Sequence, residues 1–259
     1  MLTISLDVEY DREDPRQALP YVQLTVNGVA VRALVDSGAV RTSITAPTGT
    51  QTKPAEDTGT GAFGHVYRDQ LWRASISIQD VEIGNLDIAD AGKDGKPNVG
   101  QDLLSQYRCH YKLADHQLIF DATGQLEDGE TIYLDPGKHV YLQPHWPSGI
   151  QANAVFDSGA SITVIDTSFA NRHPELMATS HLESGVDAGG HTEDTPVVEL
   201  DGPTILGHTF TKSTAAIVDL TAANATIPRP MDMILGWPLI SQVDWIIDHP
   251  AQRACVIRP

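Results

Sequence analysis

The chain has 259 residues, of which 41% are hydrophobic and 20% charged, a composition typical of a soluble globular protein. Its formal net charge of −17 argues against nucleic acids and anionic membranes as partners, because an acidic surface is repelled by both. Two cysteines, Cys109 and Cys255, are too few for a disulfide framework, and no apolar run approaches the ~18 residues of a membrane span. The acidic N-terminus lacks the basic region of a signal peptide, so we expect a cytoplasmic protein.

The first half of the chain predicts strands and one short helix. Residues 20–35 predict a β-hairpin whose turn is Asn27-Gly28, and the hairpin ends at Asp36. A loop without periodicity follows over residues 40–61. Further strands are expected at residues 75–78, 81–83 and 86–89, a glycine turn with a short helix at 98–107, and closing strands over 111–120.

The second half repeats this order. A hairpin over residues 139–156 ends at Asp157, a helix with an aspartate cap is expected over residues 166–177, and a glycine-bearing hairpin tip over 187–191. A second glycine turn and helix occupy 233–240, and closing strands are expected at 245–247 and 254–257. Matched order with diverged sequence indicates a duplication, so we expect lobes at 1–123 and 131–259 joined by a linker at 124–130.

Each half carries one copy of a four-residue string, Asp36-Ser37-Gly38-Ala39 and Asp157-Ser158-Gly159-Ala160, and each copy follows an apolar run. A carboxylate at the end of a buried strand is costly unless it is hydrogen-bonded or takes part in chemistry. The two aspartates could be structural turn residues. Their duplicated context instead favours two related units that bring two carboxylates together.

These strings resemble the catalytic motif of aspartic peptidases, and in detail that of the retropepsin-like branch. The glycine-rich flap of that family resembles Gly61-Ala62-Phe63-Gly64-His65 and, less fully, Gly189-Gly190-His191. The resemblance implies an all-β, two-lobed acid-protease fold in which each lobe is a retropepsin-like closed β-barrel and the active site lies between the lobes. The chain is then similar to a retropepsin dimer fused into one polypeptide. Asn98-Val99-Gly100 departs from the family, which has two bulky aliphatic residues before this glycine.

Two neighbouring carboxylates share one proton over a range of pH, so one can take a proton from water while the other donates to a scissile carbonyl. We therefore expect Asp36 and Asp157 to be catalytic, with no assignment of the base between them. Ser37, Gly38, Ala39, Ser158, Gly159 and Ala160 are expected to support the dyad, the serines, by resemblance, through hydrogen bonds across the lobes. Ala39 and Ala160 lack a hydroxyl to stabilise the anion, which predicts a mildly acidic to near-neutral optimum.

The expected partner is a peptide or protein substrate that lies extended beneath the flaps, bound by a monomer. Apolar residues beside the cut would contact Ile44, Phe63, Ile162 and Trp237, whereas His65 and His191 either face the substrate or lie on the flap surface. Ten histidines and two cysteines show no HExxH or CxxC spacing, so neither a metal nor another cofactor is expected. Two alternatives remain: a repurposed dyad that performs cyclisation or hydrolysis on a non-peptide substrate, and a peptide-binding module without catalysis.

Overall fold

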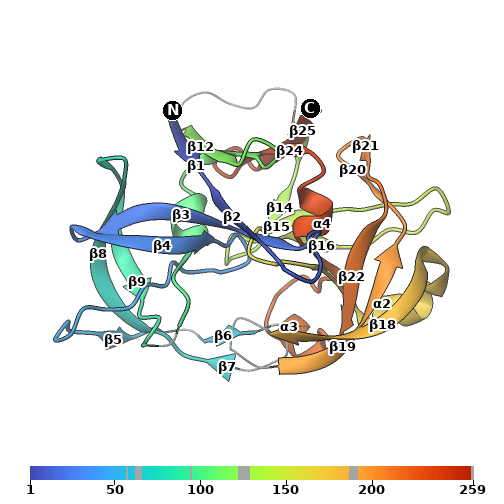
Figure 1. Ribbon diagram of the computed structural model, residues 1–259, viewed down its shortest axis with the longest axis horizontal. Helices are drawn as coiled ribbons and strands as arrows, with labels where there is room; N and C mark the ends of the chain where they lie inside the picture. Colours follow the sequence, from blue (N-terminus) through green and yellow to red (C-terminus); the bar gives the residue numbers. More distant parts are fainter. Residues whose placement is uncertain (57, 62–65, 94, 122–128, 187–191, 258–259) are drawn as a thin grey trace.

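The computed structural model describes the whole chain except residues 57, 62–65, 94, 122–128, 187–191 and 258–259. It is mostly β, with two large sheets side by side and a third sheet across one end (Figure 1). Residues 124–128 of the expected linker lie outside the described part, so the lobe boundaries stay a prediction. No helix in the described ranges is long and apolar enough to cross a membrane.

The first lobe is a seven-stranded sheet in the order β10-β4-β3-β8-β5, with β2 paired to β3 and β9 paired to β8. The predicted hairpin turn is confirmed, because Asn27 and Gly28 both have positive φ, 47° and 85°, as a type I′ turn requires. The elements are β2 (Asp7–Tyr10), β3 (Ala18–Val26), β4 (Val29–Val35), β5 (Lys53–Pro54), β8 (Gln70–Ile78), β9 (Val81–Ala89), β10 (Asn98–Val99) and α1 (Gln101–Leu104), beside the small ladder of β6 (Gly59–Thr60) and β7 (Val66–Tyr67).

The second lobe is an eight-stranded sheet in the order β14-β15-β16-β23-β17-β22-β19-β18. Its strands are β14 (Tyr133–Leu134), β15 (Val140–Leu142), β16 (Ala154–Phe156), β17 (Thr163–Asp166), β18 (Met177–Val186), β19 (Thr192–Leu200), β22 (Ser213–Val218) and β23 (Met233–Leu235). Beside it lie α2 (Thr167–Arg172), the one-turn 3₁₀ helix η1 (Pro174–Leu176), α3 (Thr221–Asn224), α4 (Trp237–Ile240) and the two-stranded ladder of β20 (Thr204–Ile205) and β21 (His208–Thr209).

A six-stranded sheet joins the lobes, and both chain ends lie beside it (Figure 1). Its order is β1 (Leu2–Ser5), β12 (Gln117–Asp121), β11 (Arg108–Lys112), β24 (Asp244–Asp248), β25 (Arg253–Ile257) and β13 (Glu130–Thr131). The central pair, β11 with β24, is antiparallel and joins the closing strands of the two halves. Backbone hydrogen bonds therefore tie the halves together.

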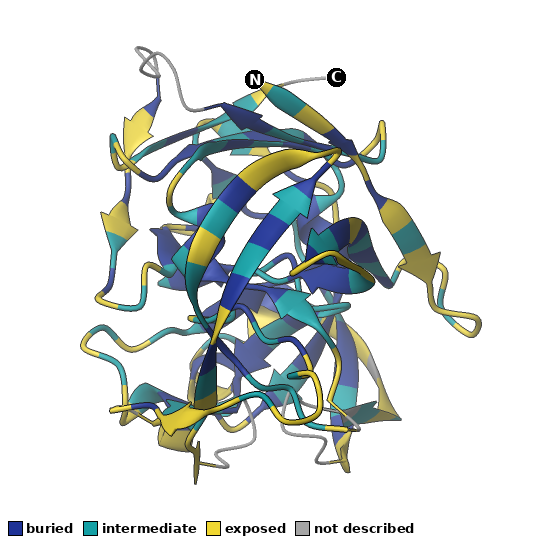
Figure 2. Ribbon diagram, turned by 90° about the vertical axis from the view of Figure 1, so that its left-hand side faces the viewer, coloured by how far each residue is buried: buried dark blue, intermediate teal, exposed yellow. Residues whose placement is uncertain are grey.

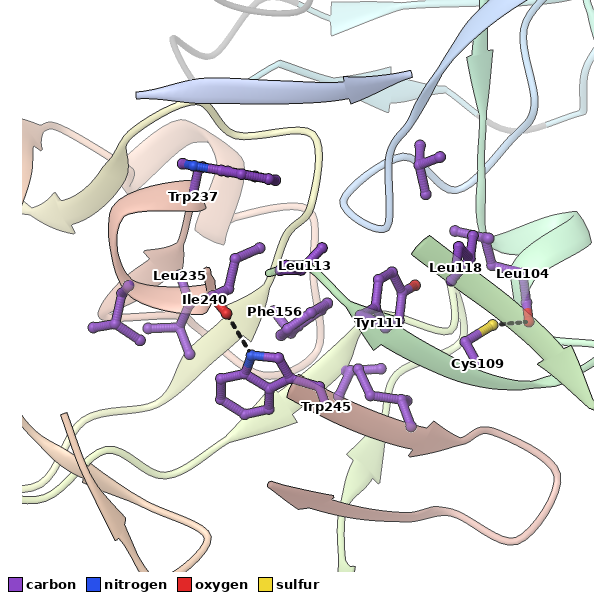
Figure 3. Close-up of a cluster of buried hydrophobic side chains, with 14 of the residues drawn as sticks. Leu104, Cys109, Tyr111, Leu113, Leu118, Phe156, Leu235, Trp237, Ile240 and Trp245 are labelled. Carbon is purple, nitrogen blue, oxygen red and sulfur yellow. Dashed lines mark hydrogen bonds between the residues drawn. The ribbon is translucent and has the colours of Figure 1, made fainter. Parts of the chain in front are cut away.

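Burial follows the pleat of the strands. Every second residue of β3, and of β8 from Trp72 onward, is buried, so dark stripes alternate with lighter ones along the sheets (Figure 2). Where the halves meet, Phe156 lies between Tyr111 and Trp245, with ring centroids 5.2 Å away on both sides (Figure 3). The indole N–H of Trp245 donates to the carbonyl of Ile240 at 2.7 Å. Removing an aromatic ring from such a core costs about 3–5 kcal/mol, so this cluster anchors the strand that carries Asp157.

One expectation needs correction, and two stretches without a predicted element form regular structure. The helix expected over residues 166–177 is α2 alone, capped by Asp166, whose carboxylate accepts from the N–H of Ser168 at 3.0 Å. Pro174 has no N–H to continue α2, and the chain passes through η1 into β18. Residues 2–10, which the sequence left unassigned, form β1 and β2 because neighbouring strands provide partners. Residues 221–224, for which no element was predicted from the sequence, form α3.

Candidate active site

The two Asp-Ser-Gly-Ala segments begin where β4 and β16 end, each beside a short parallel strand. The N–H of Asp36 donates to the carbonyl of Val99 at 3.0 Å, and the N–H of Asp157 to that of Leu235 at 3.1 Å. Each aspartate is therefore held by the strand that leads into its own lobe's glycine turn.

Gly100 and Gly236 end those short strands where the chain passes close to another backbone segment. A Cβ on Gly100 would lie 2.4 Å from a backbone atom of the first lobe's loop, and a Cβ on Gly236 would lie 2.2 Å from one in the second. Their N–H groups donate to the hydroxyls of Thr42 and Thr163, at 3.0 and 3.2 Å. The backbone crossing thus needs glycine in both lobes.

Ser37 and Ser158 exchange hydrogen bonds across the lobes. The N–H of Ser37 donates to the hydroxyl oxygen of Ser158 at 3.1 Å, and the N–H of Ser158 to that of Ser37 at 2.9 Å. Each hydroxyl then donates to a carbonyl of the other lobe, Ser37 to Phe156 at 3.0 Å and Ser158 to Val35 at 2.7 Å. Both serines are fully buried, so these four bonds hold one loop against the other without competition from water.

Gly38 and Gly159 lie against the carboxylate of the opposite lobe. A Cβ on Gly38 would come within 2.3 Å of the Asp157 carboxylate, and a Cβ on Gly159 within 2.4 Å of the Asp36 carboxylate. No side chain fits in either space. The glycines therefore let each loop approach the aspartate that it does not carry.

The carboxylates meet at one shared donor. The N–H of Gly38 lies 3.1 Å from Oδ1 of Asp36 and 3.0 Å from Oδ1 of Asp157. Asp36 also accepts from the N–H of Ala39 at 3.0 Å, and Asp157 from the N–H of Gly159 at 2.8 Å. Both aspartates keep partial exposure, so water can reach them.

Surrounding protein raises the pKa of both carboxyl groups, because burial disfavours their charged forms. For Asp157 burial and the negative charge of Asp36 raise the pKa to about 7. For Asp36 the pKa is also raised by burial, but hydrogen bonds from Asn98 and from the N–H groups of Ala39 and Gly38 oppose the shift. From the sequence we expected the missing hydroxyls of Ala39 and Ala160 to raise the pKa values of the two aspartates. In the structure, burial is the leading cause of the raised values. The pair thus keeps one proton towards neutral pH.

Two residues beside the dyad were not assigned to it from the sequence. The side-chain amide of Asn98 lies 3.4 Å from Oδ2 of Asp36, in the position that the second lobe gives to Ile234. The imidazole of His139 reaches from the second lobe to the carbonyl of Gly38 at 3.0 Å. The amide of Asn98, at a position where the family has an aliphatic residue, was the feature of the sequence that could have indicated its place beside the dyad. For His139 the only signal in the sequence was Asp135 four residues earlier. That spacing indicates a contact only when the turn between the two residues is known.

Most residues assigned to the flaps lie outside the described part of the chain: Ala62, Phe63, Gly64, His65, Gly189, Gly190 and His191. Gly61 is described and is buried. Ile44 and Trp237, expected beside the cut, are each only 3% exposed and belong to the core, while Ile162 is partly exposed. The expected contacts of Ile44 and Trp237 with a substrate therefore need correction.

Away from the dyad, a surface cavity of about 530 Å³ lies on the second lobe between α2, β19 and β22, and no dyad residue lines it. Within the described ranges no three His, Cys, Asp or Glu side chains gather closely enough to hold a metal ion. Cys109 is buried and Cys255 partly exposed, and neither forms a disulfide bond.

The sequence of residues 147–239 matches the family model described as aspartyl protease. That segment contains Asp157 and Gly236 but does not reach Asp36. No curated protein matches the chain.

Solved structures with the same fold match along nearly the whole chain. The aspartic proteinase of Irpex lacteus aligns with a TM-score of 0.56 at 13% identity, over 99% of this chain and 97% of that one. Conglutin gamma, a basic 7S globulin from lupine seeds, aligns with a TM-score of 0.52 at 12% identity, over 97% and 94% of the two chains. Residues 147–239 are thus similar to the aspartyl protease family, and the chain has the two-lobed aspartic proteinase fold over its length.

Proposed function

We propose that the protein is an aspartic endopeptidase that hydrolyses peptide bonds with the Asp36–Asp157 dyad. One observation carries this proposal: the single N–H of Gly38 donates to both carboxylates. Two aspartates 121 positions apart are thereby brought to one point, with partial exposure that lets water in. A purely structural pair would need no such access.

The reaction follows from the shared proton. The ionised carboxylate takes a proton from a water molecule while the water oxygen attacks the carbonyl carbon of the substrate. The protonated carboxyl group donates its proton to the carbonyl oxygen, giving a neutral tetrahedral diol. The carboxyl group that gained the proton of water then donates it to the amide nitrogen, while the other carboxylate takes a proton from one hydroxyl of the diol. The carbonyl re-forms, the C–N bond breaks, and an amine and a carboxylic acid are released.

The remaining parts of the proposal concern the substrate and the setting. An extended peptide or protein segment would lie between the lobes and pair its backbone with strand edges. One chain supplies both aspartates, which supports a monomer as the active form. A dyad that keeps one proton towards neutral pH suits a neutral compartment such as the cytoplasm.

The fold does not by itself fix the reaction, since a lupine seed globulin shares it. Acid–base chemistry on a non-peptide substrate and peptide binding without catalysis are therefore the readings against which the proposal must be tested. The dyad with its shared donor favours catalysis over binding alone.

The test is incubation with a mixed peptide library at pH 4 to 8, followed by mass spectrometry of the products. Asp36→Asn keeps the shape of the side chain but cannot ionise, so it should abolish cleavage. Asp80→Asn is the matched control, because Asp80 is an exposed turn residue with a positive φ that asparagine also adopts. Cleavage by the parent and the control but not by Asp36→Asn supports the endopeptidase. Cleavage that persists in Asp36→Asn, or a parent that cleaves no peptide, would overturn it.

A further inference from the structure

A hydrogen-bonded chain runs from the second lobe into the catalytic loop of the first. Asp135 and His139 flank a tight turn just before β15, and Nδ1 of His139 lies 2.8 Å from Oδ2 of Asp135. The other ring nitrogen, Nε2, lies 3.0 Å from the carbonyl oxygen of Gly38. The Asp135 side chain is 2% exposed, and its Oδ1 accepts from the N–H of His139 at 2.9 Å.

This geometry defines the charge of the imidazole. A carboxylate and a peptide carbonyl are both acceptors, so each ring nitrogen must carry a hydrogen to bond its partner. His139 with both hydrogens is an imidazolium cation. Burial alone would lower the pKa of His139, but the hydrogen bond and the charge of Asp135 outweigh it and raise that pKa above its ordinary value.

The carbonyl of Gly38 belongs to the same peptide unit as the N–H of Ala39. That N–H donates to Oδ1 of Asp36 at 3.0 Å. When a cationic donor binds the carbonyl of a peptide, its N–H becomes a stronger donor, because bonds in a chain polarise one another. The positive charge of His139 therefore reaches Asp36 through one peptide unit.

We propose that His139, oriented by Asp135, is a positioning residue of the dyad, which locks the Gly38–Ala39 peptide and makes Asp36 the ionised member of the pair. It touches neither carboxylate and acts through the loop that holds Asp36. The inference rests on the proposed function, since it names the residue that sets which aspartate acts as the base.

The first lobe has no equivalent device at the matching position. Tyr21 pairs with the residue two before Asp36, and Tyr141 pairs with the residue two before Asp157. Counting back from these tyrosines, the position of His139 corresponds to Leu19, which cannot donate a side-chain hydrogen bond. The second lobe thus supports the aspartate of the first, whereas the leucine gives no such support in return.

The charges around His139 define how the device responds to pH. Asp135 comes from its own turn, Asp157 acts on it from the second lobe's catalytic loop, and Lys138 precedes it in the chain. As the pH rises through the raised pKa of His139, the ring loses one hydrogen and with it one of its two bonds. The support of Asp36 therefore weakens on the alkaline side.

The first experiment needs no variant. Histidine resonances labelled with ¹³C and ¹⁵N are followed against pH in the intact protein, with His139 assigned through its loss in His139→Gln. We expect His139 to titrate above ~6.5, the ordinary value, with both ring nitrogens protonated at pH 6. A neutral ring at pH 6 would overturn the inference.

The second experiment uses His139→Leu, which installs the residue of the first lobe, and His139→Gln, which keeps an amide donor without the charge. Because Asp36 loses support, the acid limb of the kcat/KM profile should move up by about one pH unit in His139→Leu, the size of a typical shift from one lost charged partner. His139→Gln should restore part of that shift. His181→Gln, at an exposed histidine bonded to Glu183, is the control and should leave the profile unchanged.

A third readout separates this inference from the proposed function. The carboxyl ¹³C shifts of Asp36 and Asp157 report their ionisation whether or not any peptide is cleaved. If Asp36 titrates below Asp157 in the parent and rises in Asp135→Asn, the positioning role stands even for a protein without peptidase activity. If neither the acid limb nor the Asp36 carboxyl shift moves in folded Asp135→Asn and His139→Gln, the role is refuted.

Discussion

The two lobes hold their aspartates in the same backbone arrangement but surround the carboxylates differently. In both, the aspartate N–H bonds the strand before a glycine turn, and a serine exchanges bonds with its counterpart. Around the carboxylates the symmetry ends. Both carboxylates accept from the N–H of Gly38, but Asp36 also receives the N–H of Ala39 and the amide of Asn98, whereas Asp157 also receives the N–H of Gly159. A duplicated scaffold thus positions the pair, and diverged neighbours distinguish its members.

The glycines test the shared part of the comparison most severely. Gly159→Ala places a Cβ within 2.4 Å of the Asp36 carboxylate, so the carboxylate or the loop must move. A displacement near 1 Å at a catalytic group costs about 100-fold in rate, and we expect kcat/KM to fall by at least that factor. Gly149→Ala is the control: it strains a positive φ of 86° but meets no atom within 4 Å. Equal losses of kcat/KM in both variants would contradict this explanation.

The serines test whether the lobes contribute equally to the interface. Ser37→Ala and Ser158→Ala each remove a buried hydroxyl that both accepts and donates across the lobes. A buried group left without its partner costs about 1–3 kcal/mol. We expect each variant to lose about 2 kcal/mol of unfolding free energy in urea titrations. A loss confined to one of the two serines would show that the interface is not symmetric.

The dyad should make the protein less stable as the pH rises. The folded-state pKa of Asp157 is raised to about 7, so the folded protein binds a proton there that the unfolded chain releases near pH 4. Stability therefore falls between about pH 4 and pH 7, because the unfolded state binds fewer protons. Asp157→Asn removes this loss. Relative to the parent, the variant should therefore gain about 1–2 kcal/mol of unfolding free energy between pH 4 and pH 8, a figure discounted for the partial exposure of the group. Thermal unfolding of the parent and the variant at a series of pH values measures this difference. If stability depends on pH in the same way in both proteins, the pKa of Asp157 is not raised.

Asn98 tests the smallest difference between the lobes. Asn98→Ile installs the residue of the second lobe and removes the donor 3.4 Å from Asp36. The bond is long, so we expect the acid limb of the kcat/KM profile to rise by only about 0.3 pH unit, a fraction of what a close charged partner produces. Stability should not fall, because the buried Oδ1 of Asn98 has no partner among the described residues. A rate profile that shifts downwards would show that Asn98 disfavours the charge on Asp36.

The repeated scaffold was readable from the sequence because it depends on local patterns. The Asn27-Gly28 turn, the cap at Asp166 and the duplicated Asp-Ser-Gly-Ala strings each carry their structural reason within a few residues. The third sheet was not readable in full, because β1 is a strand through its pairing with β12, over 110 positions away. Burial of Ile44 and Trp237 likewise depends on the packing of distant segments.

The asymmetry of the site escaped the sequence for the same physical reason. His139 acts on Gly38 across 101 positions, and no local pattern records that contact. Asp157 has its pKa raised by burial, which follows from the closeness of the lobes rather than from any residue within its own string. Local motifs therefore predict which residues form the site, and tertiary contacts determine how its two halves differ.

The most direct test of this account is a pH titration of the two dyad carboxyl groups by ¹³C NMR in the intact parent protein. We expect Asp36 to ionise first and Asp157 to keep its proton until about pH 7. If both carboxyl groups ionise together near pH 4, the ordinary value for aspartate, or if Asp157 ionises first, the two lobes do not divide the roles of the pair as proposed.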